Sequence, residues 1–262
     1  MITLPLKGKT VFIPRSGKQG KELSKRIVQL GGEPYCIPLI EFREGKDPNG
    51  LQYLKSLNQY DWVIFTSQNG VKFFFQQLGK NNITLSPQTK IAAVGEKTKD
   101  ALQKHQFQVS FVPTLFSADD FAKEFDDDGM RPKKVLIPKG NLARDIIAKS
   151  LISKGWTVDE WIIYDTIFPI DSKEKLASLL EHVRLDYALF TSPSTVHHFM
   201  EIAKEPKLEK KAKMIDFISI GPVTKKAIEG YGWKVTASPQ KYTVDAMLDC
   251  LCKLMTKREE LE

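Results

Sequence analysis

Short, mostly apolar runs alternate with amphipathic helical patterns along most of this chain. The runs occupy residues 11–13, 63–65, 91–94 and 218–220. Apolar residues at consecutive positions are typical of strands that both faces of a parallel sheet bury. A helical pattern then follows, such as Leu23, Ile27 and Leu30 with polar residues between them. Strands that alternate with helices predict βα units, in which helices cover both faces of a parallel sheet.

Similar sequence motifs recur about 125 residues later in the chain, a spacing of close to half its length. DWVIFTSQNGV, which begins at Asp61, matches DYALFTSPSTV, which begins at Asp186, and KIAAVGEKTKDAL matches DFISIGPVTKKAI. GKTVFIPRSG pairs with PKKVLIPKGN, and VSFVPTLFSADDF pairs with VTASPQKYTVDAM. Pairs that keep their order and spacing indicate a duplicated unit. We therefore predict two flavodoxin-like α/β lobes, each built on a parallel sheet.

The composition is that of a globular protein. The 262 residues are 42% hydrophobic, and no apolar run is long enough to cross a bilayer. The first residues lack a basic segment followed by an apolar stretch, so we expect a cytoplasmic protein rather than a secreted one. The three cysteines lack metal-ligand spacing, and we expect reduced thiols. The net charge of +7 favours an anionic partner, either nucleic acid or a small polyanion.

The turns that follow the predicted strands offer groups that bind anions. In α/β sheets, ligands bind beyond the carboxyl ends of the strands, where helices begin. Ser192 and Gly221 each precede a proline in the pattern of a helix cap, and Ser67 and Gly95 take the matching positions in the other repeat. A helix N-terminus presents unpaired N–H groups. Each turn can therefore bind a carboxylate or phosphate, or it can simply cap its helix.

Other side chains near these turns extend the candidate set. Thr98 and Thr224 come about one turn into their helices, where a hydroxyl can still reach a bound oxygen. Arg15 and the SGKQG turn after it add positive charge. Lys139 takes the position of Arg15 in the second repeat, and we expect Arg144 just inside the helix that follows. These cations are either carboxylate partners or plain surface charges.

No motif for a nucleotide, a metal or a nucleic acid stands out. No G-x-G-x-x-G follows a strand, and no G-x-x-x-x-G-K-[ST] occurs. The few histidines fit packing or surface roles better than metal binding. Basic residues are spread along the chain without an aromatic-interleaved motif or a recognition helix, which argues against nucleic acid as the partner. We expect neither a cofactor nor a metal.

The order of several short motifs resembles the uroporphyrinogen-III synthase family. The motifs are IPR near the start, FTSQNGV, AVGEKT, YDT, FTSPSTV, IGPVT and YTVDAML, and the resemblance extends from about Lys9 to Leu251. Each motif is short, but their order and spacing together are specific. The substrate of this family, hydroxymethylbilane, is a linear tetrapyrrole that bears eight carboxylates. A basic protein with several exposed helix N-termini suits such a ligand.

The resemblance also implies a discontinuous domain organisation. Plain duplication would divide the chain near its middle, whereas in this family the first βα unit packs with the C-terminal half. The implied lobes are residues 1–35 with 171–262, and residues 41–162. Two extended segments, 36–40 and 163–170, would join the lobes as a two-stranded hinge, and their prolines and β-branched residues suit an extended chain.

The activity that the resemblance implies is closure of hydroxymethylbilane to uroporphyrinogen III, in tetrapyrrole synthesis. We separately expect a cytoplasmic protein and a monomer, because nothing in the sequence demands association. Water is lost, and the last pyrrole ring is inverted through an azafulvene cation and a spiro intermediate. Positioning and preorganised electrostatics should supply most of the catalysis. One acid can assist the leaving hydroxide, and the aligned candidate is Tyr164, because a phenol is protonated at neutral pH. Tyr164 can equally be a tyrosine that packs at the hinge.

The candidates are therefore one catalytic residue, Tyr164, and a set of substrate-binding residues. That set comprises Arg15, Ser16, Ser67, Asn69, Gly95, Thr98, Lys139, Arg144, Ser192, Ser194, Gly221 and Thr224. An alternative function shares this binding logic without turnover: a two-lobed sensor or carrier for an anionic metabolite. Formation of the type III isomer from hydroxymethylbilane distinguishes the two.

Overall fold

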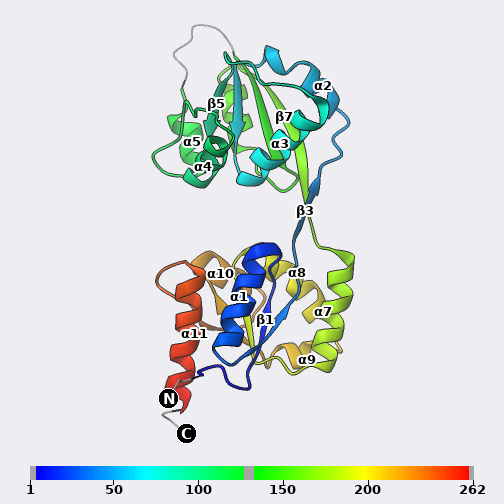
Figure 1. The fold of residues 1–262 in the computed structure, drawn as a ribbon, viewed down its shortest axis with the longest axis vertical. Helices are drawn as coiled ribbons and strands as arrows, with labels where there is room; N and C mark the ends of the chain where they lie inside the picture. The colour runs from blue at the N-terminus through cyan, green and yellow to red at the C-terminus, as the bar shows by residue number, and fades with distance from the viewer. Residues whose placement is uncertain (1–3, 127–132, 260–262) are drawn as a thin grey trace. The chain divides into compact units, whose positions relative to one another are not determined.

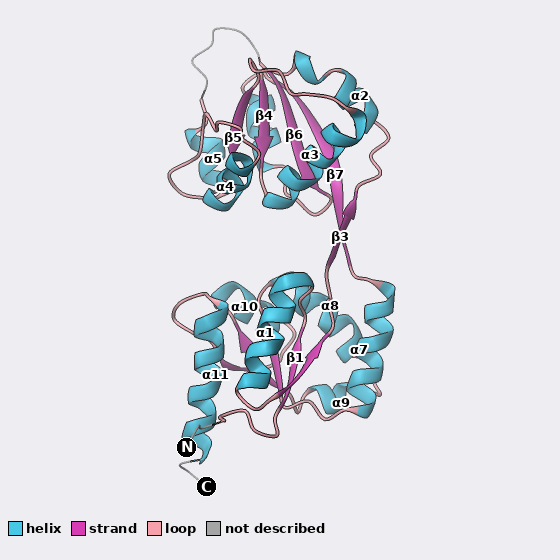
Figure 2. Cartoon of the chain, in the orientation of Figure 1, coloured by secondary structure: helices cyan, strands magenta, loops and turns pink. Residues whose placement is uncertain are grey.

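The chain forms two compact units, which Figure 1 shows in a computed structural model that describes residues 4–126 and 133–259. Unit 1 combines the described residues up to Glu41 with those from Ile167 onward, and unit 2 runs from Phe42 to Thr166. Each unit contains a five-stranded sheet with helices on both faces (Figure 2).

Unit 1 has the strand order β10-β9-β8-β1-β2, with parallel pairing throughout. Its strands are β1 (Thr10–Ile13), β2 (Glu33–Cys36), β8 (Tyr187–Phe190), β9 (Asp216–Ser219) and β10 (Val235–Ala237). Its helices are α1 (Gly17–Gln29), α7 (Ile170–His182), α8 (Pro193–Ala203), α9 (Glu209–Ala212), α10 (Pro222–Glu229) and α11 (Val244–Glu259). Helices α7 to α10 bury one face of the sheet, and α1 and α11 bury the other.

Unit 2 has the strand order β3-β7-β6-β4-β5. Its strands are β3 (Glu41–Glu44), β4 (Trp62–Phe65), β5 (Lys90–Ala93), β6 (Lys134–Gly140) and β7 (Thr157–Ile167). Its helices are α2 (Gly50–Lys55), the short 3-10 helix η1 (Leu57–Gln59), α3 (Gln68–Asn81), α4 (Glu96–Lys104), α5 (Ala118–Glu124) and α6 (Ile146–Ser153). Helices α2 to α4 cover one face, and α5 and α6 cover the other.

The duplication seen in the sequence is a duplication of this sheet. In unit 1 the neighbours β2-β1-β8-β9 match β7-β6-β4-β5 in unit 2, strand for strand. The pairings among β6, β7, β4 and β5 are parallel, as in unit 1. The order β2-β1-β8-β9-β10 is that of a flavodoxin-like sheet. The predicted fold class, two flavodoxin-like α/β lobes with parallel sheets, is confirmed.

One repeated aspartate fixes the same strand pair in both units. The Asp186 carboxylate accepts a hydrogen bond from the backbone N–H of Thr10 at 2.9 Å, and the Asp186 N–H donates to the Thr10 carbonyl at 3.1 Å. In unit 2, Asp61 makes the same two bonds with Lys134, each at 2.9 Å. Each aspartate thus holds the start of a neighbouring strand, which explains why the repeated phrase begins with this residue.

The segments that we expected to join the lobes have a different internal structure from a simple two-stranded hinge. Strand β2 ends at Cys36, and the residues up to Ile40 form no strand. The next strand, β3, lies directly after them, at the edge of the unit 2 sheet beside β7. The other segment begins with the last part of β7, which ends at Ile167, and its final residue, Ile170, begins α7. Strand β6 pairs with β7 from Thr157 to Tyr164.

The parallel strands bring the candidate residues of each unit to one edge of its sheet. Because the strands of a parallel sheet end at the same edge, the helices that follow them begin there. Helices α3 and α4 begin directly after β4 and β5 in unit 2, and α8 and α10 follow β8 and β9 in unit 1. We call this the carboxyl edge of each unit.

Candidate functional site

A serine and a tyrosine meet at the carboxyl edge of unit 2. Ser67 is the N-cap of α3, and its Oγ accepts the Gly70 N–H at 3.0 Å. The Tyr164 hydroxyl, from β7, lies 3.1 Å from the same Oγ. These two residues were predicted separately, one as a turn residue and one as a candidate acid, and the structure brings them into hydrogen-bond contact.

Aromatic packing fixes the position of Tyr164. Its ring stacks on Phe73 with centroids 5.6 Å apart, and Phe42 meets it edge-on at 5.8 Å. The side chain is 8% exposed. A methyl group on Gly140 would lie 2.5 Å from Tyr164 Cζ and 2.8 Å from its hydroxyl oxygen. Only a glycine in β6 leaves room for the tyrosine there, so the hydroxyl is held in one place by its neighbours.

The start of α4 lies beside the start of α3. Gly95 is the N-cap of α4, and its carbonyl accepts the Thr98 N–H at 3.0 Å. The Gln68 side chain donates to the Lys97 carbonyl at 3.0 Å and so links the two helix starts. Thr98 is buried, whereas Asn69, in the first turn of α3, is half-buried. At the start of α4, a ligand could therefore reach the backbone N–H groups more easily than the buried Thr98 side chain.

Lys139 does not have the open environment that we expected. It is 4% exposed, and its ammonium donates to Asp145 at 2.6 Å and to Glu160 at 2.5 Å. Burial lowers the pKa of Lys139, but the two hydrogen bonds to carboxylates more than offset this, so its pKa lies above the ordinary value. The bond from Lys139 also lowers the pKa of Asp145.

The sheet register explains this burial. Glu160 on β7 is paired with Ile137 on β6, two residues before Lys139, so both charged side chains share one face of the sheet. Two neighbouring carboxylates leave little of the ammonium for a substrate. Arg144 differs, since its side chain is 70% exposed and lies 3.7 Å from Asp119. It was expected just inside the next helix, but it precedes α6, whose N-cap is Asp145.

In unit 1, Arg15 lies directly after β1. Its guanidinium donates to Gln19 at 2.5 Å, and partial burial lowers the pKa of Arg15. Ser16 is the N-cap of α1, but its side chain makes no cap hydrogen bond. Gly17 follows with a φ of +63°, a left-handed conformation that favours glycine. The start of α1 therefore has backbone N–H groups that the serine hydroxyl does not cap.

Two further helix starts complete the carboxyl edge of unit 1. Ser192 caps α8 and accepts the Thr195 N–H at 3.4 Å, with Ser194 half-buried in the first turn. Gly221 is the N-cap of α10, and Thr224 is buried three residues later. Both caps have extended backbone and a proline at the start of the helix, as the sequence pattern predicted.

The sequence analysis missed two aromatic residues at these edges. Phe116 lies against Gly95 in unit 2, and Tyr242 lies against Gly221 in unit 1. The matched blocks VSFVPTLFSADDF and VTASPQKYTVDAM align these two residues with each other. Comparison of the two blocks for aromatic character, rather than identity, would have found them.

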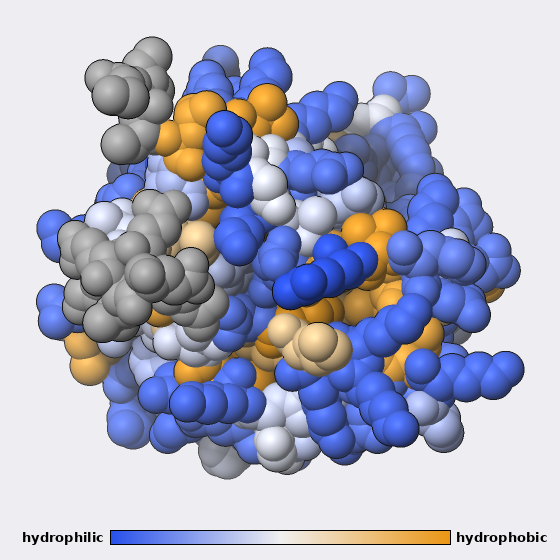
Figure 3. All heavy atoms as spheres, turned by 90° about the horizontal axis from the view of Figure 1, so that it is seen from below, coloured by the Kyte–Doolittle hydropathy of each residue, from blue (hydrophilic) through white to orange (hydrophobic). Residues whose placement is uncertain are grey.

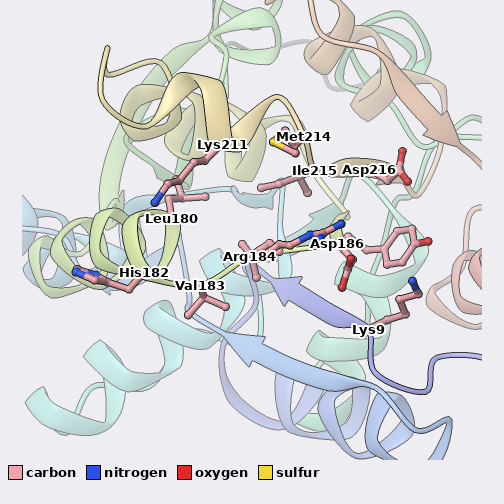
Figure 4. A pocket seen from close by; sticks show the side chains of 12 residues that line it. Lys9, Leu180, His182, Val183, Arg184, Asp186, Lys211, Met214, Ile215 and Asp216 are labelled. Atoms are coloured by element: carbon pink, nitrogen blue, oxygen red, sulfur yellow. The ribbon is translucent and has the colours of Figure 1, made fainter.

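A hollow of about 570 Å³ lies elsewhere in unit 1, at the amino ends of its strands (Figure 4). Lys9, Arg184, Asp186 and Lys211 are among the residues that line it. A hollow of about 380 Å³ surrounds Asp61 at the equivalent place in unit 2. Because a hollow lies at the strand starts of both units, we attribute the two hollows to the repeated fold and not to a functional site.

Two observations concern the described residues as a set. Residues 4–126 and 133–259 hold no group of three or more histidine, cysteine, aspartate or glutamate side chains placed to bind a metal. None of their helices is long and apolar enough to cross a membrane. The face that Figure 3 presents is mostly hydrophilic, with smaller hydrophobic areas between the polar side chains.

Known proteins resemble this chain over most of its length. The family model for uroporphyrinogen-III synthase HemD matches residues 21–249. A porphyrin biosynthesis protein HemD from Ruminiclostridium josui is 28% identical over 253 residues, which cover 95% of this chain and 49% of that protein. The chain thus spans about half the length of that relative. A uroporphyrinogen-III synthase from Chlorobaculum parvum is 26% identical over 238 residues, which cover 89% of this chain and 94% of that protein.

The fold also matches a solved structure. A uroporphyrinogen III synthase from Thermus thermophilus superposes with a TM-score of 0.69 at 17% identity, covering 96% of this chain and 100% of that one. At this identity the likeness shows the fold alone. The match to the family model, in contrast, extends over most of the sequence. The chain belongs to the uroporphyrinogen-III synthase family.

Proposed function

We propose that this chain closes hydroxymethylbilane to uroporphyrinogen III with loss of water and inversion of the last pyrrole ring. Family membership supports the reaction. The observation that carries the residue assignment is the hydrogen bond between Tyr164 and Ser67 at the start of α3. This hydrogen bond places a side-chain hydroxyl that can donate a proton next to the N-terminus of α3 in unit 2.

Substrate binding is assigned to the helix starts at the two carboxyl edges. The bilane carries carboxylates, and a helix N-terminus stabilises an anion through unpaired N–H groups and the helix dipole. Ser67 and Gly95 mark such starts in unit 2, and Ser192 and Gly221 mark them in unit 1. Arg15 adds a positive charge beside the start of α1. Most of these interactions use the backbone, so they depend on the fold more than on any one side chain.

The chemical step begins with loss of the terminal hydroxyl. The C–O bond breaks, and the departing hydroxide takes a proton and leaves as water, so a cationic azafulvene remains. We assign the proton to the Tyr164 hydroxyl. Later closure of the ring releases a proton from the attacked pyrrole carbon, and this proton restores the acid. Positioned acids of this kind contribute about 100- to 10,000-fold to a rate.

Inversion requires a restrained substrate. Without an enzyme the bilane closes without inversion, so the protein must hold the chain in the geometry that leads through the spiro intermediate. Several fixed anion sites can do this, because each immobilises one carboxylate arm before reaction. Lys139 is then a supporting residue, since Asp145 and Glu160 already bind its ammonium.

The test is the identity of the product. Enzymatically generated hydroxymethylbilane is supplied to the purified protein, and the porphyrins obtained after oxidation are separated by isomer. We expect the type III isomer at a rate proportional to protein concentration. Only the type I isomer, at the spontaneous rate, would rule out the synthase and leave a non-catalytic binding protein. The monomeric state and cytoplasmic location expected from the sequence stay predictions, which sedimentation and cell fractionation can check.

A further inference from the structure

The loops that precede α5 and α11 make the same hydrogen bonds at aligned positions. In unit 2 the Ser117 N–H donates to the Leu115 carbonyl at 2.8 Å, and in unit 1 the Thr243 N–H donates to the Lys241 carbonyl at 2.9 Å. This bond between residues two apart is that of a γ-turn. The hydroxyl of Ser117 or Thr243 then accepts an N–H of the first helical turn, at 3.0 and 3.2 Å respectively. These hydrogen bonds fix the backbone on both sides of the residue at the centre of each turn.

That central residue is aromatic and exposed in both units. Phe116 is 60% exposed and Tyr242 is 63% exposed. Of the described phenylalanine, tyrosine and tryptophan residues, Phe42 is the one other exposed example, and its ring contacts Tyr164. Every exposed aromatic ring of the described chain therefore adjoins a residue of the candidate site.

Both aromatic residues lie against a glycine that begins a helix. A methyl group on Gly221 would lie 2.9 Å from Tyr242 Cδ1, closer than carbon atoms approach. A methyl group on Gly95 would lie 3.6 Å from the Phe116 Cβ. Both glycines have extended backbone that any residue can adopt. At Gly221 the space that Tyr242 occupies therefore favours glycine, whereas at Gly95 a methyl group would lie at ordinary contact distance from Phe116.

Stability does not account for this arrangement. An aromatic side chain that remains more than half exposed contributes little burial to its unit, and rigid exposure of apolar rings carries a solvation cost. The arrangement nevertheless occurs twice, on turns that share few identical residues. A ligand that buries the rings would explain both copies.

We infer that Phe116 and Tyr242 bind pyrrole rings of the substrate, each next to the helix start that takes a carboxylate. This rests on the proposed function, since the bilane combines flat aromatic rings with carboxylate arms. A helix N-terminus fixes the charged end of an arm but not the plane of the ring that bears it. An aromatic side chain at a fixed position supplies that second restraint through ring–ring contact. The two residues are positioning residues for ring orientation, which decides the product isomer.

The experiment compares Phe116→Ala and Tyr242→Ala with variants that keep a ring, Phe116→Tyr and Tyr242→Phe. Leu115→Ala is the matched control, because Leu115 is adjacent and 64% exposed but not on a helix-start glycine. KM, kcat and the share of type III product are measured with enzymatically generated hydroxymethylbilane, at low and high salt. The melting temperature of each variant is recorded.

We expect each alanine variant to raise KM about 10-fold, the upper size of one lost ring–ring contact, and the double variant to raise it about 100-fold. The share of type I product should rise. Because the contact is not ionic, the ratio of variant to wild-type KM should not change with salt. The ring-keeping variants and Leu115→Ala should stay within about twofold of the wild type, which is small beside one such contact.

Two results would overturn the inference. One is an unchanged KM and isomer ratio in both alanine variants. The other is a loss that the ring-keeping variants share and that follows the melting temperature, because that pattern would indicate a structural role. Failure of the proposed function is a separate result: the wild-type protein itself would then yield only the type I isomer, and this inference would fall with it.

Discussion

At the scale of single residues, the site in unit 2 depends on how one tyrosine is held. The Tyr164 hydroxyl has Ser67 as its partner, stacking on Phe73 fixes its ring, and Gly140 makes the space that it occupies. As the proposed acid, a tyrosine held by packing and one hydrogen bond would lose little entropy when it donates its proton, which favours proton transfer.

Tyr164→Phe should reduce kcat about 10- to 1,000-fold, because it removes the proposed proton donor and keeps the ring packing. Ser67→Ala should cost less in kcat, since the backbone N–H groups of α3 remain. It should also lower the unfolding free energy by about 1 kcal/mol through the lost cap. The measurements are steady-state kinetics and urea unfolding. If Tyr164→Phe turns over normally while Ser67→Ala does not, the acid is another group or a bound water.

A glycine pair tests the position of the tyrosine. Gly140→Ala places a methyl group 2.5 Å from Tyr164 Cζ, so the ring must move, and kcat should fall about 100-fold, as expected for a displacement near 1 Å. Gly79→Ala in α3 is the control. A methyl group there meets nothing within 4 Å and should stabilise the protein by about 0.5–1 kcal/mol without loss of activity. Wild-type turnover in Gly140→Ala would show that the exact ring position is unimportant.

At the scale of elements, the sequence predicted where helices begin better than it predicted which charged side chains meet across neighbouring strands. The helix caps at Ser67, Ser192 and Gly221 were predictable because caps have a local sequence signature. The burial of Lys139 was not, because it depends on Glu160, which lies on the next strand and faces the same side of the sheet. The local sequence pattern indicates where a helix begins, but the register in which two strands pair decides which charged side chains come into contact.

The Lys139–Asp145 pair predicts a pH dependence of stability. Since the folded pKa of Asp145 lies below its unfolded value of about 3.9, its contribution is present above that pH and is lost as pH falls through the folded pKa. Since the pKa of Lys139 is raised, its contribution is present below about pH 10 and is lost as pH rises through the folded pKa. Urea unfolding from pH 7 to pH 3 measures the acid side.

Asp145→Asn should flatten the loss of stability on the acid side. In a Lys139→Met background the same substitution should have no further effect, because the partner of the carboxylate is already gone. An acid transition that Asp145→Asn leaves unchanged in the wild-type background would mean that other carboxylates dominate it.

The repeated aspartates make a matched pair at strand starts. Asp186→Ala removes acceptors of the Thr10 N–H and hydroxyl, and Asp61→Ala removes the acceptor of the Lys134 N–H. Each should lower stability by about 1–3 kcal/mol, the cost of a hydrogen bond to a charged group. Hydrogen exchange gives the sharper measurement, since the freed amide, Thr10 or Lys134, should lose protection in its own variant only. Equal loss at both amides in either variant would contradict a local role.

At the scale of the whole molecule, the sequence predicted the repeated sheet but not the boundaries of its elements. Blocks matched at a constant spacing predict two similar lobes because similar sequences adopt similar folds. They do not predict that β3 adds an edge strand to unit 2, for which unit 1 has no counterpart in the matched order. They also missed Phe116 and Tyr242, because identity was compared and chemical type was not.

Unit 2 should fold by itself when residues 41–167 are produced as a separate chain. Its two hydrophobic clusters contain only residues of that range, from Tyr53 to Tyr164 and from Trp62 to Val158. All five strands of its sheet also lie within it. A domain of this size with its own core is within the range that folds independently, at roughly 50–250 residues.

We expect the separate unit 2 chain to show a cooperative urea transition and native near-ultraviolet circular dichroism. The fragment should not form the type III isomer, because the helix starts at Ser192 and Gly221 belong to unit 1. A fragment with helical far-ultraviolet signal but no cooperative transition would show that unit 2 needs unit 1 to complete its packing.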